Sequence, residues 1–174
     1  MSTDRVLAAR DVVDLITDAS SIINLSNAGA LGLVTAIPGV TICVSPLVVG
    51  ECEPTCAAEL LAQQERGTVR FVDADEIPAE LFLSLLDAHE LGEGETECLA
   101  LLLKGDYSFC CDDGKARSVG ISLKGEAHVL GSIRLLKWAV VTGLCAPEEA
   151  FQYYQRMKDA GGFLPDLPRE WFDP

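Results

Sequence analysis

The sequence lacks the features of several large protein classes. Its 174 residues include two histidines, and its seven cysteines form no C-x-x-C pair, so a structural zinc site is not indicated. No basic patch followed by an apolar block opens the chain, and its apolar runs are shorter than a membrane span. Neither a G-x-S-x-G nucleophile motif nor a G-x-x-x-x-G-K-[ST] phosphate loop is present. These absences predict a cytoplasmic protein with reduced cysteines and no membrane partner.

Basic residues are also scarce. The chain has 13 Lys and Arg against 27 Asp and Glu, a formal charge of -14. This balance argues against non-specific nucleic-acid binding, which relies on basic side chains that neutralise phosphates. It does not exclude an enzyme that meets nucleic acid through bound metal and a local basic rim. Aromatic residues make up 6% of the chain and hydrophobic residues 49%, which suits a core of aliphatic side chains.

Short apolar runs alternate with helical patterns along the chain. The expected strands share a run of β-branched or aliphatic residues and cover 12–17, 41–44, 69–72, 108–111 and 127–130. The expected helices cover 20–28, 31–37, 45–66 with a kink or break at Pro54, 78–86, 93–104, 114–123, 131–141 and 147–159. Ser20 or Ser21 is expected to cap the first of them. The alternation predicts an α/β fold, a three-layer sandwich with a mainly parallel central sheet.

The length favours one domain over residues 1–174, with a core at about 12–160. Residues 161–174 form a tail after the last helix. Its large apolar side chains are expected to pack back on the domain through Phe163, Trp171 and Phe172.

Acidic residues follow two of the expected strands directly. Asp18 follows the first strand, and Asp112 and Asp113 follow the strand at 108–111. Ligands of parallel sheets bind at the carboxyl ends of the strands, so these acids belong where a ligand would lie. Each could instead cap the helix that it precedes.

Further acids lie at the starts of helices. Glu51 lies about a turn into the helix after the second strand, and Glu95 and Glu97 lie in the first turn of the helix at 93–104. Glu51 could be a solvated surface residue, and the other two could complement a helix dipole. Together with the acids after the strands, they predict a cluster of carboxylates. Mg²⁺ and Mn²⁺ prefer carboxylate oxygens, so such a cluster suits either ion.

At these residues the sequence resembles the PIN-domain family of metal-dependent ribonucleases, in particular its solitary bacterial and archaeal members. The matching stretches are TDASSIINLSNAG, VSPLVVGE, LGEGETECLALLLKGDYSFCCDDGKARSVG and, more weakly, GSIRLLKWAVVTGL. The strongest signal is G-E-x-E-x-x-x-L followed by D-D-x-K-A-R in this order.

The resemblance implies roles for individual residues. The implied catalytic acids are Asp18, Glu51, Glu95 and Asp113. The implied metal ligands come from the same acids together with their neighbours, and they are Asp18, Glu95, Glu97, Asp112 and Asp113. The doubled Asp leaves open which of the two aspartates is the ligand. The residues implied to meet RNA are Ser20, Lys115 and Arg117, although the two basic residues could also form a solvated helix face.

The implied function is a Mg²⁺- or Mn²⁺-dependent endoribonuclease that cleaves single-stranded RNA. A toxin role with a small antitoxin partner and a homodimer are also implied by the resemblance. The alternative is a module that keeps the fold, is weakly active or inactive, and binds nucleic acid or protein. A phosphatase fits less well, because it needs Asp-x-Asp after the first strand, where this chain has Asp18-Ala19-Ser20.

Overall fold

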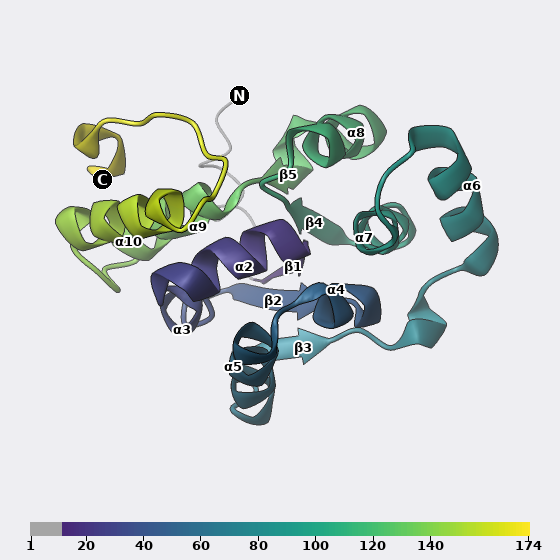
Figure 1. Cartoon of the computed structure of the whole chain (residues 1–174), viewed down its shortest axis with the longest axis horizontal. Coiled ribbons are helices and arrows are strands. Elements are labelled where there is room, and N and C mark those ends of the chain that lie inside the picture. Colours follow the sequence, from purple (N-terminus) through teal and green to yellow (C-terminus); the bar gives the residue numbers. More distant parts are fainter. Residues whose placement is uncertain (1–11) are drawn as a thin grey trace.

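The structure, a computed structural model, describes residues 12–174, so the first eleven residues of the expected domain lie outside it. Five parallel strands form one sheet in the order β3-β2-β1-β4-β5 (Figure 1). The strands are β1 (Val13–Thr17), β2 (Val40–Val44), β3 (Val69–Phe71), β4 (Tyr107–Cys110) and β5 (Val129–Leu130). The predicted α/β fold with a parallel sheet is therefore confirmed.

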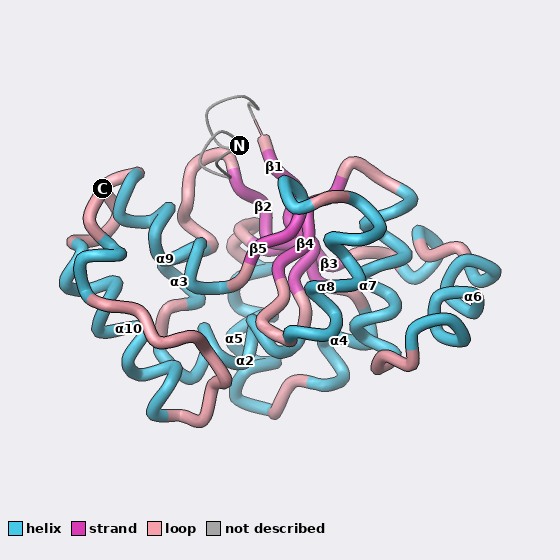
Figure 2. Tube along the Cα trace, turned by 90° about the horizontal axis from the view of Figure 1, so that it is seen from above, coloured by secondary structure: helices cyan, strands magenta, loops and turns pink. Residues whose placement is uncertain are grey.

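Helices cover both faces of the sheet. They are α2 (Ala19–Ala28), α3 (Leu31–Val34), α4 (Pro46–Glu51), α5 (Pro54–Glu65), α6 (Ala79–His89), α7 (Glu93–Lys104), α8 (Gly114–Lys124), α9 (Ser132–Val141) and α10 (Pro147–Asp159). In Figure 2 the helices α2, α3, α5, α9 and α10 lie on one side of the strands, and α6, α7 and α8 lie on the other. Because both faces are covered, the central strand reads as an almost continuous apolar run, and Leu15 and Ile16 are fully buried.

The described chain also contains short 3₁₀ turns: η1 (Ala74–Glu76) precedes α6, η2 (Glu126–His128) precedes β5, and η3 (Arg169–Phe172) lies in the tail. The turn η2 replaces the first half of the strand expected at 127–130, so only Val129 and Leu130 pair with β4. The helix expected at 31–37 is shorter than predicted and ends at Val34.

The long helix expected at 45–66 is two helices. Cys52 is extended, with φ -74° and ψ 138°, and α5 begins at Pro54. The residue before a proline is disfavoured in the helical region, and Glu53 accordingly has ψ 156°. The break ends α4 at Glu51, and this places that carboxylate at the end of a short helix.

The tail after α10 lies along the domain. The hydroxyl of Tyr154 donates to the carbonyl of Pro165 at 2.7 Å and accepts from the backbone N–H of Leu167 at 3.0 Å. Phe172 is fully buried, and its ring lies 5.6 Å from that of Tyr154. Phe163 does not pack with them as expected, because its side chain is 99% exposed.

All seven cysteines are free thiols. Among residues 12–174, no helix combines the length and the apolar character that crossing a bilayer requires.

Candidate active site

The candidate site lies where the winding direction of the sheet changes. From β1 the chain winds outward through β2 and β3, and then returns to the other side of β1 to form β4 and β5. Parallel sheets bind ligands at the carboxyl ends of the two strands beside such a switch point, here β1 and β4. Thr17 and Cys110 are paired at those ends, and the backbone N–H of Asp18 donates to the carbonyl of Cys110 at 2.9 Å. The first residues after β1 and β4 therefore lie side by side.

Asp18 is 2% exposed and caps α2. Its Oδ2 accepts from the backbone N–H and the hydroxyl of Ser20, so Asp18 is the cap and the expected cap at Ser20 or Ser21 was wrong. The same oxygen accepts from the thiol of Cys111 at 3.2 Å. Burial and the negative charge of Asp18 raise the pKa of that thiol, which keeps it protonated and able to donate. Within residues 12–174, no hydrogen bond uses the other oxygen of Asp18.

Glu95 and Glu51 converge at the start of α7. Glu95 turns back to accept from the backbone N–H of Gly92 at 3.0 Å, as in a capping box. Glu51 reaches across from the end of α4 and accepts from the N–H of Gly94 at 3.2 Å. A Cβ on Gly94 would lie 2.6 Å from Oε1 of Glu51, so this approach depends on the missing side chain.

The site acids lie near enough to influence one another's ionisation. Burial raises the pKa of Glu95, and the negative charges of Asp18, Asp113 and Glu51 raise it further. The pKa of Glu51 is also raised, first by burial and then by nearby negative charges that include Asp18. None of the ion pairs among residues 12–174 includes any of these four carboxylates. As far as the described residues show, the four acids repel one another and form no ion pair that would offset this repulsion.

The two adjacent aspartates, Asp112 and Asp113, point to different partners. Oδ1 of Asp113 accepts from the N–H groups of Lys115 and Ala116 at 2.8 and 2.9 Å, so Asp113 caps α8 at the edge of the acid group. Asp112 turns toward α9 instead. Its oxygens accept from the N–H and the hydroxyl of Ser132 at 2.8 and 2.6 Å and from the amide of Asn24 at 2.8 Å. Of the two, Asp113 is the one whose charge acts on the other site acids.

Glu97 has a different setting from its neighbours. It is 8% exposed, and its Oε2 accepts from the backbone N–H of Leu47 at 2.9 Å. Because Leu47 lies in the first turn of α4, this contact ties α7 to the helix that carries Glu51. Glu97 therefore links α7 to the helix that carries Glu51.

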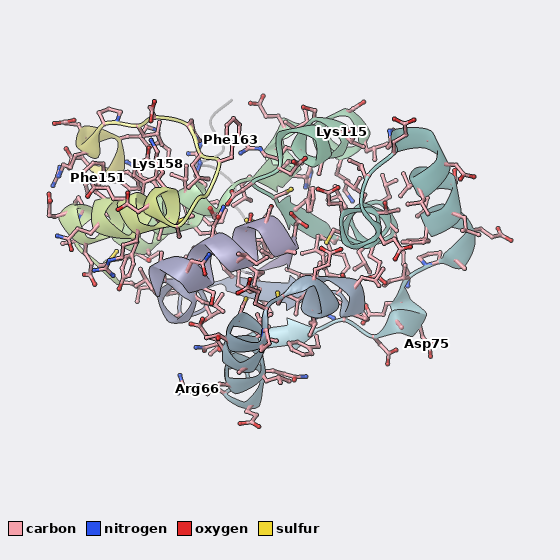
Figure 3. All side chains as sticks on the ribbon, viewed as in Figure 1. Arg66, Asp75, Lys115, Phe151, Lys158 and Phe163 are labelled. Atoms are coloured by element: carbon pink, nitrogen blue, oxygen red, sulfur yellow. The ribbon has the colours of Figure 1, made fainter. Side chains whose placement is uncertain are left out.

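The three residues expected to meet RNA border the acids. The hydroxyl of Ser20 accepts from the N–H of Asp112 at 3.1 Å and so links the ends of β1 and β4. Lys115, labelled on α8 in Figure 3, donates to the carbonyl of Glu90 at 2.9 Å and bridges to the loop before α7. Arg117, two residues further along α8, is half-buried and lies on a different face of the helix from Lys115.

The oxygen donors and their shared negative charge fit a hard divalent cation such as Mg²⁺ or Mn²⁺. In the part of the chain from residue 12 onward, however, no three acids, cysteines or histidines stand close enough to form a ready-made ligand set. The side chains of the acids would have to move closer together to bind one ion.

The sequence interpretation missed Asn24 and Cys111. Asn24 lies four residues after Ser20 on the same helix, and that spacing could have placed both on the face toward Asp112. Cys111 gave no signal, because a cysteine in an apolar run reads as a small core residue.

A family model described as a PIN domain matches residues 14–167 of this chain. Neither the curated proteins nor the solved structures give a significant match.

Proposed function

The chain belongs to the PIN-domain family, whose members are generally nucleases, and on that premise we propose that it is a metal-dependent endoribonuclease acting on single-stranded RNA. One observation carries the proposal. Asp18, Glu51, Glu95 and Asp113 lie at four different helix ends around the switch point of the sheet, and burial together with the charges of the other three acids raises the pKa of Glu95.

The side chains divide the work as follows. Asp18, Glu51, Glu95 and Asp113 would hold one or two Mg²⁺ or Mn²⁺ ions. When bound, such an ion activates a water and neutralises charge on the phosphate under attack. Asp18 and Asp113 are held rigidly by their capping hydrogen bonds. Glu51, at the end of a short helix, is the acid with most freedom to close around the ion.

The basic residues would orient the RNA strand. Lys115 and Arg117 lie on α8, directly after the Asp113 cap. The carbonyl contact of Lys115 leaves its positive charge without a paired carboxylate in the described chain, so that charge can meet a phosphate. In a chain with a net charge of -14, such a local basic rim is what brings RNA to an acidic site.

A fold-keeping module without catalytic activity is the second candidate. It is favoured by the absence, within residues 12–174, of three acids already close enough to share an ion. An inactive domain should gain no thermal stability from Mn²⁺, whereas a nuclease site should. The toxin role, the antitoxin partner and the homodimer stay predictions from the family resemblance.

The test is cleavage of an internally labelled single-stranded RNA in EDTA and after Mn²⁺ is added in excess. We expect internal cuts with Mn²⁺ and none in the chelator, with duplex RNA and single-stranded DNA as parallel substrates. An Asp18→Asn preparation purified in the same way controls for contaminating ribonuclease. Cleavage that persists in EDTA, or equal cleavage by Asp18→Asn, would reject the proposal.

A further inference from the structure

Phe163 is the most exposed large hydrophobic residue of the described chain, at 99%. The chain is held by hydrogen bonds on both sides of Phe163. On its amino-terminal side, Gly162 donates its N–H to the carbonyl of Met157 at 2.9 Å. On its carboxyl-terminal side, the hydroxyl of Tyr154 holds both Pro165 and Leu167. The backbone around Phe163 is therefore anchored while the ring points into solvent, as Figure 3 shows.

The anchoring also fixes Phe163 beside the acids. A Cβ on Gly162 would lie 2.7 Å from Oδ1 of Asn24, so the tail lies directly against α2 here. The amide of Asn24 in turn donates to Asp112. The tail thus packs on Asn24 at Gly162, and Asn24 donates a hydrogen bond to Asp112, the first of the two aspartates after β4.

Two hollows meet at Phe163. One, of about 220 Å³, is lined by Ser20, Asn24, Gly162 and Asp113, and the last of these is one of the four site acids. The other, of about 240 Å³, lies between α8, β5, α9 and the tail, and its walls include Arg117, Arg134, Leu130, Ile133, Leu164 and Trp171. Phe163 and Asp112 line both hollows.

The second hollow has the chemistry of a base pocket. Its walls combine aliphatic side chains and the indole of Trp171 with two guanidinium groups and the carboxylates of Asp112 and Glu126, and Arg134 lies 5.8 Å from the Trp171 ring centre. Its volume is below the roughly 300–1,000 Å³ of sites for drug-sized ligands, so it suits one planar group. Proteins that bind single strands combine such aromatic platforms with positive charge along the backbone.

We propose that Phe163 stacks on one base of a single-stranded RNA whose neighbouring base enters the hollow beside Arg117, which places the intervening backbone next to Asp113. This inference rests on the proposed function for its substrate class. Position favours RNA as the occupant, because Phe163 lines the same hollow as Asp113, one of the acids of the proposed catalytic site. Base stacking needs a π face, which any base provides and an aliphatic side chain does not.

The test is RNA binding without cleavage, measured by fluorescence anisotropy in EDTA with a short single-stranded RNA that carries one 2-aminopurine. We expect Phe163→Ala to weaken binding roughly tenfold, the size of one lost stacking contact. Phe163→Tyr should bind as wild type, and 2-aminopurine quenching on binding should be lost with Phe163→Ala and kept with Phe163→Tyr. Because the side chain makes no buried contact, these variants should fold normally.

Phe163→Leu separates RNA from a protein occupant. A base-stacking site should lose affinity with Leu, whereas an apolar docking site for a protein segment would tolerate it. Wild-type RNA binding by Phe163→Leu would therefore overturn the proposal. Matched controls are Leu83→Ala, which removes another exposed apolar residue on α6, and Arg66→Ala, which removes a charge at the far end of α5 (Figure 3).

The two proposals fail in different ways. Phe163-dependent binding in EDTA without cleavage in Mn²⁺ would reject the nuclease and keep the base site. Cleavage by wild type together with unchanged binding by Phe163→Ala would keep the nuclease and reject the base site. A wild type that neither binds nor cleaves RNA would overturn both.

Discussion

Two groups of acidic residues differ in how their charges are compensated. In the first group, the guanidinium of Arg70 on β3 lies 3.5 Å from Asp14, near the amino-terminal end of β1, and 3.4 Å from Glu76 in the turn after β3. It also donates to the hydroxyl of Tyr107 at 2.7 Å, and this contact is the largest cause of its raised pKa. In the second group, the four site acids have no cation among residues 12–174.

The difference separates a structural network from a binding site. Around Arg70 the charges are compensated within the chain, and the side chains of Arg70 and Asp14 are 37% and 42% exposed, so each ion pair stabilises the fold by about 1 kcal/mol or less. Among the four site acids, the repulsion between carboxylates lowers the stability of the fold, and a bound cation would relieve that repulsion. An uncompensated acid group at a switch point is the arrangement expected of a metal site.

The largest expected contrast is between Asp18→Asn and Asp14→Asn. Asn keeps an acceptor oxygen for the α2 cap, so Asp18→Asn should fold with an unchanged or higher Tm. RNA cleavage should fall roughly 10²- to 10³-fold, as when one preorganised electrostatic group is lost. Asp14→Asn makes the same chemical change at the Arg70 network and should keep full activity. Initial rates of RNA cleavage in Mn²⁺ measure the activity of both variants. Equal losses of activity would show that the site acids and the Arg70 network do not differ in function.

The second contrast is the response to metal. Mn²⁺ at about a hundred times its Kd should stabilise the fold by about 2.7 kcal/mol. For a chain of this size that is a Tm rise of roughly 5–10 °C, measurable by differential scanning fluorimetry. Asp14→Asn should show the full rise and Asp18→Asn little of it. A rise that Asp18→Asn retains would locate the ion elsewhere.

The third contrast uses two glycines near Glu51. Gly94→Ala would place a Cβ 2.6 Å from the Glu51 carboxylate, which must swing away from the N–H that it now accepts. Because only a flexible side chain moves, the fold should persist while Mn²⁺ affinity, measured by calorimetry, falls roughly tenfold. Gly50→Ala adds a methyl on α4 where nothing lies within 4 Å. It should stabilise α4 by roughly 0.5–1 kcal/mol and leave the affinity unchanged.

The smallest effect concerns pH. The pKa of Glu95 is raised above 4.5, so the folded state holds its proton more tightly than the unfolded chain does. That contribution to stability is full below pH 4.5 and is lost as the pH rises through the raised pKa. In EDTA at pH 7, Glu95→Gln should therefore have a Tm roughly 1–2 °C above wild type, and the difference should shrink on acidification. Glu76→Gln, which removes a partner of Arg70, should give no such gain.

The sheet and the position of Asp18 followed from the sequence, because buried parallel strands are short aliphatic runs and an acid directly after one must lie at the carboxyl edge. The sequence did not show which of Asp112 and Asp113 faces the other site acids. That depends on Ser132 and Asn24, which lie on other elements and donate hydrogen bonds to Asp112. The hydrophobic pattern also misplaced Phe163. An apolar residue in a tail is expected to be buried, but the flanking contacts of Tyr154 hold its neighbours and leave it outside.

Each of the four carboxylates is supplied by a different helix end, from α2, α4, α7 and α8. During synthesis from the amino terminus, the chain carries Asp18 and Glu51 long before Asp113 exists, and β4 cannot pair with β1 until later still. A half-made or locally unfolded copy therefore has no assembled acid pocket. Under the proposed function, cleavage would require a chain synthesised at least through Asp113 and folded with β4 beside β1.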